Sequence, residues 1–191
     1  KNVLAQTYFW IGELSYKMGR IDEAIEHLEK YILDPIEIGE ITKKHANYTL
    51  GYCHLKNNNY TKALQLFTIA ADFNPYTESS AYQKDALVRL SDCQFMTKQY
   101  KQALKSYQKI IDLGWNLEDY ATLQKAIIYG ALGLNKEKLK ILNSYDTEFS
   151  QSKYLSDARM ELADTYTSKE QFQEAITPLS KVILDNKATE F

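Results

Sequence analysis

The sequence predicts an all-α protein of about ten helices, and three observations lead to this expectation. The chain has only seven Gly and three Pro in 191 residues, which favours long helices over a turn-rich β-protein. Apolar residues make up 45% of the chain, which is enough to bury a core. The third observation is the stretch GRIDEAIEHL at 19–28, because its spacing of bulky, alanine and large apolar residues recurs along the chain.

The recurrence divides the chain into repeats. The same offsets return at 58–67, 98–107 and 170–179, and a degenerate copy at 134–142 has leucine at the alanine position. Aligning Ala24, Ala63, Ala103, Leu139 and Ala175 gives periods of 39, 40, 36 and 36 residues, which are typical of stacked helical units. We therefore expect a single array over 1–191, with repeats at approximately 2–36, 41–76, 79–115, 117–148 and 151–186.

The second repeat indicates why each unit is expected to form two helices. Apolar and small residues at helical spacing predict a first helix around 48–55 and a second over 60–70. The sequence KNNN at 56–59 is the turn between them. Pro75 disfavours helical angles at the residue before it, and Ser79 is expected to cap the next helix.

These residues resemble the tetratricopeptide repeat family, the TPR family. The first, third and fifth repeats match the consensus at several positions, and the second matches it most fully, at Leu50, Gly51, Tyr60, Ala63, Phe67, Ala70 and Pro75. The resemblance implies a right-handed superhelical solenoid of about five helix-turn-helix repeats, whose first helices line a concave surface. The consensus has a packing reason, because small residues permit close helix approach and large ones fill the remaining space.

Pro178 interrupts the pattern of the last predicted helix. It lies about six residues into that helix, beyond the first turn where proline is tolerated. We therefore expect a kink or a break at this position.

Candidate metal ligands and reactive groups are few. His45, Cys53 and His54 occur within one predicted helix, but their spacing does not bring three side chains together, so no metal site is expected. Cys53 and Cys93 occupy equivalent positions of successive first helices, where small buried residues are expected, and both should stay reduced.

Catalysis is not expected either. Asp157, Glu161 and Asp164 share one helical face, which is better explained as a solvated stripe than as a carboxylate site. The chain shows no nucleophile–base pair, glycine-rich phosphate loop or zinc-protease motif, and no cofactor is predicted. The sequence thus predicts a protein that is not an enzyme.

Charge and hydropathy limit the class of partner. A net charge of −2 gives no field that would attract nucleic acid or anionic lipid. No stretch approaches the length of about eighteen apolar residues that membrane insertion requires. Because the chain begins at Lys1 rather than Met, we expect it to be part of a longer protein. Twenty Lys against three Arg, and repeat periods like those of bacterial envelope TPR proteins, favour the periplasm or cell envelope over the cytoplasm.

The TPR resemblance implies a scaffold for protein–protein interaction that binds a peptide or partner protein on its concave face. An alternative is the sensor or docking region of a larger signalling protein, such as a kinase or transcription regulator, with the activity outside this segment. The family's groove positions carry aromatic residues interleaved with acids, which favours a segment with apolar anchors and Lys or Arg. The predicted peptide-binding residues are Phe9, Glu13, Tyr16, Tyr48, Tyr52, Leu55, Asp92, Phe95 and Met96.

Overall fold

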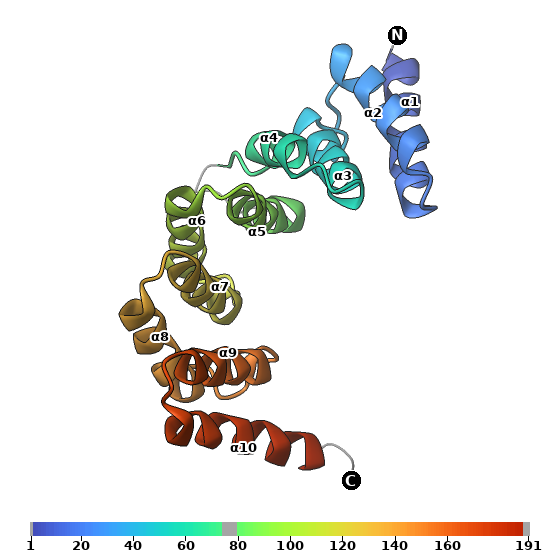
Figure 1. Cartoon of the computed structure of the whole chain (residues 1–191). Coiled ribbons are helices and arrows are strands. Elements are labelled where there is room, and N and C mark those ends of the chain that lie inside the picture. The colour runs from blue at the N-terminus through green and yellow to red at the C-terminus, as the bar shows by residue number, and fades with distance from the viewer. Residues whose placement is uncertain (1, 74–79, 189–191) are drawn as a thin grey trace. The chain divides into compact units, whose positions relative to one another are not determined.

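The structure, a computed structural model, describes residues 2–73 and 80–188, and within them the chain forms ten α-helices. These residues contain no strand, only an isolated antiparallel bridge between Ile38 and Ile41. The all-α expectation is confirmed (Figure 1). The helices are α1 (Asn2–Lys17), α2 (Ile21–Leu33), α3 (Lys43–Lys56), α4 (Tyr60–Ala70), α5 (Ala81–Met96), α6 (Tyr100–Leu113), α7 (Glu118–Ala131), α8 (Asn135–Glu148), α9 (Leu155–Ser168) and α10 (Phe172–Ala188).

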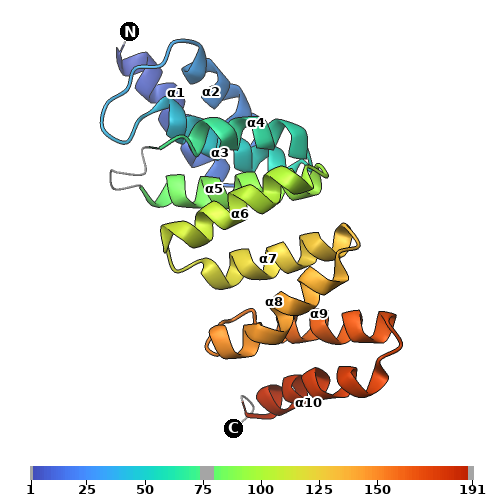
Figure 2. The ribbon, with the colours of Figure 1, turned by 90° about the vertical axis from the view of Figure 1, so that its left-hand side faces the viewer.

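The chain divides into two compact units. Unit 1 covers Lys1–Ser106 and unit 2 covers Tyr107–Phe191, so that the boundary falls inside α6. In unit 1, α1 packs on α2, α2 on α3, α3 on α4 and α4 on α5. In unit 2, α7 packs on α8, α8 on α9 and α9 on α10, and Figure 2 shows α9 and α10 as its last pair. None of the helices in the described residues has the length and apolar character needed to cross a membrane.

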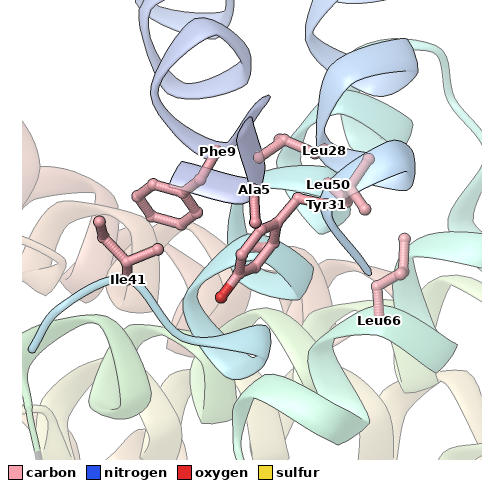
Figure 3. Close-up of a cluster of buried hydrophobic side chains, with 8 residues drawn as sticks. Ala5, Phe9, Leu28, Tyr31, Ile41, Leu50 and Leu66 are labelled. Carbon is pink, nitrogen blue, oxygen red and sulfur yellow. The ribbon is translucent and has the colours of Figure 1, made fainter. Parts of the chain in front are cut away.

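The core of unit 1 forms where the first two helix pairs meet. Phe9, Leu28 and Tyr31 are fully buried, and Leu50 of the next pair packs against them. Figure 3 shows Tyr31 at the centre of this cluster. Its hydroxyl donates a hydrogen bond to the backbone carbonyl of Ile36 at 3.3 Å, so the buried polar tip is satisfied.

A smaller core forms in unit 2 between α7, α8 and α9. Leu123, Leu142 and Tyr145 are its large buried side chains. The Tyr145 hydroxyl donates to the backbone carbonyl of Asp119 at 2.9 Å. Each helix pair therefore depends on a neighbouring pair for its burial, as expected of a repeat protein.

Two glycines allow the helices of a pair to approach closely. A Cβ placed at Gly12 would lie 2.5 Å from Cγ of Leu28, and one at Gly51 would lie 2.8 Å from the Phe67 ring. Both distances are too short for non-bonded carbon atoms. The small residues in the sequence pattern therefore lie where a large side chain of the second helix packs directly on the backbone of the first helix.

The turn inside every repeat has the same backbone geometry. A residue two positions before each second helix has a left-handed φ between +55° and +75°. Its N–H donates to the carbonyl three residues earlier, and the N–H of the following residue donates to a carbonyl five residues earlier. This is the Schellman arrangement that ends many helices. The five residues are Gly19, Asn58, Lys98, Gly133 and Glu170.

The shared turn corrects the alignment of the fourth repeat. In the other repeats alanine lies five positions after the left-handed residue, and five positions after Gly133 is Lys138, not Leu139. Lysine fits there because the facing Gly130 has no side chain; a Cβ at Gly130 would lie 3.0 Å from Cδ of Lys138. The lysine then extends to α9, where Nζ pairs with Oε2 of Glu161 at 2.6 Å. The corrected periods are 39, 40, 35 and 37 residues.

The last helix and the start of α5 differ from what the sequence predicts. A break at Pro178 is ruled out, because α10 continues through it as one helix from Phe172 to Ala188, and the expected kink stays a prediction. The N-cap of α5 is Ser80, whose side chain and Gln83 form a capping box. The predicted cap, Ser79, lies outside the described residues, as does Pro75.

Candidate functional site

The first helices of unit 1 bring a set of aromatic side chains together. α1, α3 and α5 follow one another in Figure 2, and α3 contacts both of the others directly. The His45 and Tyr82 rings stack with 4.8 Å between their centroids, Tyr48 and Tyr52 meet edge to face at 5.1 Å, and Tyr16 lies 6.2 Å from Tyr52. All five side chains are half-buried. We term this surface the aromatic face, defined by Tyr16, His45, Tyr48, Tyr52 and Tyr82.

Charged groups of α5 hold the aromatic face in place. Tyr48 donates a hydrogen bond to Oδ2 of Asp85 at 3.0 Å, and Tyr52 donates to the same oxygen. The Arg89 guanidinium donates to the Tyr52 hydroxyl at 2.9 Å and to Asp85 at 3.3 Å. It also pairs with Asp92 at 2.6 Å. The two rings of α3 are thus fixed to α5 by a continuous hydrogen-bonded network.

Burial sets the charge state of this network. It raises the pKa of Tyr52 to about 12, with the hydrogen bond to Asp85 acting in the same direction. Burial, followed by the charge of Asp85, raises the pKa of Tyr48 still further. Burial lowers the pKa of Arg89, but Asp92 and Asp85 outweigh this effect and the net pKa is raised. Near neutral pH the tyrosines are therefore neutral donors and the arginine is charged, which suits recognition rather than proton transfer.

Two of the predicted binding residues are not available to a ligand. Phe9 is fully buried in the core of unit 1, where its ring meets Tyr31 edge to face at 5.4 Å. Glu13 is buried as well, and its carboxylate accepts a hydrogen bond from the Thr49 hydroxyl. Both residues point between α1 and its neighbours, because these groove positions also form the contact of the first repeat with the second.

The remaining predicted residues reach the surface to different degrees. Leu55, Asp92 and Phe95 are half-buried, and Met96 is exposed. The Phe95 ring lies 5.8 Å from that of Tyr100 on α6. Together with Tyr16, Tyr48 and Tyr52, these residues remain candidates for contact with a partner.

Four residues of the site were missed by sequence reasoning: His45, Tyr82, Asp85 and Arg89. The spacing of Asp85, Arg89 and Asp92, at four and three residues, was a usable signal for ion pairs along one helix face. No comparable signal exists for His45 and Tyr82, which meet across two helices. Arg89 also changes the chemistry expected of a partner. Because Asp92 already pairs with Arg89, it is less available to a Lys or Arg of a bound segment.

The cysteines lie behind this face. Cys53 and Cys93 are free and fully buried, as expected of small core residues. Burial raises the pKa of each thiol to about 12, which suppresses the reactive thiolate. His45 instead stacks on Tyr82, and in residues 2–73 and 80–188 no three His, Cys, Asp or Glu side chains are arranged to hold a metal ion.

We expect Cys53 and Cys93 to react slowly with a thiol reagent in the folded protein and completely after denaturation. The reason is their burial and raised pKa. Titration with Ellman's reagent, with and without guanidinium and with no reductant, checks this. Fewer than two thiols per denatured chain would show that the cysteines are oxidised.

The acidic stripe on α9 consists of surface residues. Glu161 pairs with Lys138, whereas Asp157 and Asp164 are exposed to solvent. This placement agrees with a solvated stripe on a helix face.

Comparison with known proteins gives one family and a group of similar folds. The model of the family described as "Soluble NSF attachment protein, SNAP" matches residues 2–121. No curated protein matches the chain.

Among solved structures, MamA (residues 41 to the end) from Desulfovibrio magneticus RS-1 aligns with a TM-score of 0.76 at 16% identity, covering 98% of this chain and 97% of that one. YrrB, titled a TPR protein with an unusual peptide-binding site, gives 0.67 at 21%, covering 92% and 83%. The apo form of RapI gives 0.78 at 16%, covering 97% and 72%. These likenesses show a TPR-like helical repeat fold.

Proposed function

The chain belongs to the family of soluble NSF attachment proteins, SNAP, and on this premise we propose that it is a non-catalytic scaffold that holds a peptide or partner protein. The segment that it binds lies against the aromatic face and the adjoining residues Leu55, Phe95 and Met96. The observation that carries the proposal is the fixed, half-exposed arrangement of tyrosine rings across α1, α3 and α5.

The face is suited to binding because it is organised before a partner arrives. Tyr48 and Tyr52 are held by Asp85 and Arg89, so little side-chain freedom is lost on contact. Large rings with a polar tip supply both apolar area and hydrogen bonds, as they do at many protein interfaces.

The chemistry of the partner follows from the internal ion pairs. Because Glu13 and Asp92 are already partnered, they contribute less to attracting cations than the sequence suggested. The rings therefore favour a segment with apolar or aromatic anchors, and a Lys or Arg is recognised through cation–π contact with an exposed ring.

The test is capture of partners from a lysate by the chain and by a variant carrying Tyr52→Ala and Phe95→Ala. We expect the variant to lose its partners while circular dichroism shows that it remains helical. The control is Phe172→Ala, which removes an exposed ring of α10 in unit 2 and should keep every partner. If the folded double variant retains all partners, the aromatic face is not the binding surface.

A further inference from the structure

α10 carries an apolar stripe beside the face that packs on α9. Between positions 172 and 185 its least exposed residues are Ala175, Pro178 and Val182, and α9 is the helix against which it packs. An aliphatic residue follows each of them by one position, about 100° further round the helix. These three residues, which we term the α10 stripe, are 37% to 56% exposed: Ile176, Leu179 and Ile183.

The equivalent residues of earlier second helices are covered by other parts of the chain. The alignment through the repeat alanines places Leu179 at Leu28 of α2 and at Phe67 of α4, and both of these are fully buried. The other two members of the α10 stripe correspond to Ile25 and Ile32 of α2, which pack against the core cluster shared by α2 and α3. In the first repeat, this side of the second helix is therefore covered by the first helix of the next repeat.

α1 carries a second exposed stripe, on the side opposite its buried residues Ala5, Phe9 and Gly12. The members of this stripe follow one another at intervals of three or four positions, so they form one face of the helix. Its large apolar side chains are 47% to 75% exposed. The hydroxyl of its one polar member donates to the carbonyl of Val3 at 2.7 Å, so burial would not leave it unsatisfied. The α1 stripe consists of Val3, Thr7, Trp10, Leu14 and Met18.

The equivalent side of α3 is buried against the first repeat. Aligning the glycines at 12 and 51 places three buried residues of α3 at the central positions of the α1 stripe: Ala46, Thr49 and Cys53. Thr49 donates a hydrogen bond to Glu13 of α1. Ala46 belongs to the core cluster that contains Leu28 of α2. This side of a first helix is therefore the one that meets the preceding repeat, and on α1 it is exposed.

The two stripes are the two halves of one kind of interface. The chain forms this interface internally where α3 packs on α2, with the equivalents of the α10 stripe on α2 and those of the α1 stripe on α3. Neither stripe contains a charged residue. End repeats of a solenoid ordinarily have a polar outer face, which keeps such proteins soluble. Two unlike complementary surfaces on one chain give a heterologous contact, in which each copy binds the next.

We propose that α10 docks α1 of a second copy of this chain, so that copies associate head to tail. The contact continues from one copy to the next the interface that α2 and α3 form within the chain. Leu179 takes the role that Leu28 has inside the chain. Trp10 and Leu14 have larger side chains than Thr49 and Cys53, so they bring more apolar area to the contact. A second copy is the occupant because the chain itself supplies the matching surface.

Sedimentation equilibrium of the whole chain tests the proposal, and we expect the weight-average mass of the wild type to rise with protein concentration. Leu14→Glu and Ile176→Glu should each weaken association about ten- to a hundredfold, because each places a charge in an apolar contact. Both side chains are more than half exposed, so both variants should remain helical by circular dichroism. The control is Leu184→Glu, which changes a leucine of α10 outside the stripe and should associate like the wild type.

Mixing the two single variants tests the head-to-tail geometry. Leu14→Glu keeps an intact α10 stripe and Ile176→Glu an intact α1 stripe, so an equimolar mixture should form a dimer and nothing larger. A contact between two α10 helices would instead leave Leu14→Glu associated, and a contact between two α1 helices would leave Ile176→Glu associated.

Four results would overturn the proposal. These are a wild-type chain that stays monomeric at every concentration, either single variant associating like the wild type, a mixture of the two that forms no dimer, and a monomeric Tyr52→Ala, Phe95→Ala variant. The last result would assign self-association to the aromatic face.

Discussion

Phe67→Ala is expected to lower the free energy of unfolding of unit 1 by about 3–5 kcal/mol. Phe67 is fully buried, and its ring closes over Gly51, where no other side chain can fill the space from the α3 side. It also supports the aromatic face from behind, with its centroid 5.4 Å from that of Tyr52. Truncation therefore leaves a cavity at the centre of the second repeat and loosens the candidate binding surface.

Urea unfolding followed by tryptophan fluorescence measures this effect. Each unit contains one tryptophan, Trp10 in unit 1 and Trp115 in unit 2, so a Trp115→Phe background reports on unit 1 alone. The matched control is Phe172→Ala, since that ring is 62% exposed and its removal should cost less than about 0.5 kcal/mol. Similar costs for the two variants would contradict the packing described for Phe67.

Arg89→Met is expected to destabilise unit 1 by about 1–3 kcal/mol. The substitution removes the cation that pairs with both Asp85 and Asp92 and the donor that reaches the Tyr52 hydroxyl. The cost stays below that of a fully buried pair because the Arg89 side chain is 32% exposed and water reaches it. Methionine keeps much of the aliphatic volume, so the change reports mainly on the lost charge and hydrogen bonds.

The control for this prediction is Arg20→Met. That side chain is 62% exposed and pairs with Glu23 at 3.5 Å, so its loss should change stability by less than about 0.5 kcal/mol. Adding Asp92→Asn to Arg89→Met should recover part of the lost stability, because it removes a carboxylate left without its cation. If Arg89→Met matches Arg20→Met, the network does not contribute to the stability of unit 1.

The sequence predicted the helices well because the spacing of small and large apolar residues along the chain depends on the local packing of one helix on the next. Gly51, Ala63 and Phe67 stand at offsets that only a close helix pair explains, and the structure places them in contact or in the core. The fourth repeat was misaligned by one residue because Lys138 takes a position where the pattern has alanine. Only the geometry of the turn, together with the space at Gly130, reveals that a lysine fits there.

The candidate site was only partly predictable for a different reason. Tyr48 and Tyr52 were found because they sit at the groove positions of a known consensus. Their hydrogen bonds to Asp85 join residues that are more than thirty positions apart in sequence, and such pairings leave no periodic signal. Likewise, Phe9 occupies a groove position of the pattern yet is buried against Tyr31, since the same helix face serves both recognition and packing.

The common turn has a wider consequence. It is closed by main-chain hydrogen bonds, and the residue that takes the left-handed conformation is a glycine in two repeats and an asparagine, a lysine or a glutamate in the others. The path by which each second helix returns along the first is therefore independent of most side chains around it. Exposed residues of one repeat can change without altering the backbone course of that repeat or the next. The residues that contact a partner can therefore vary among relatives while the backbone of each repeat stays the same.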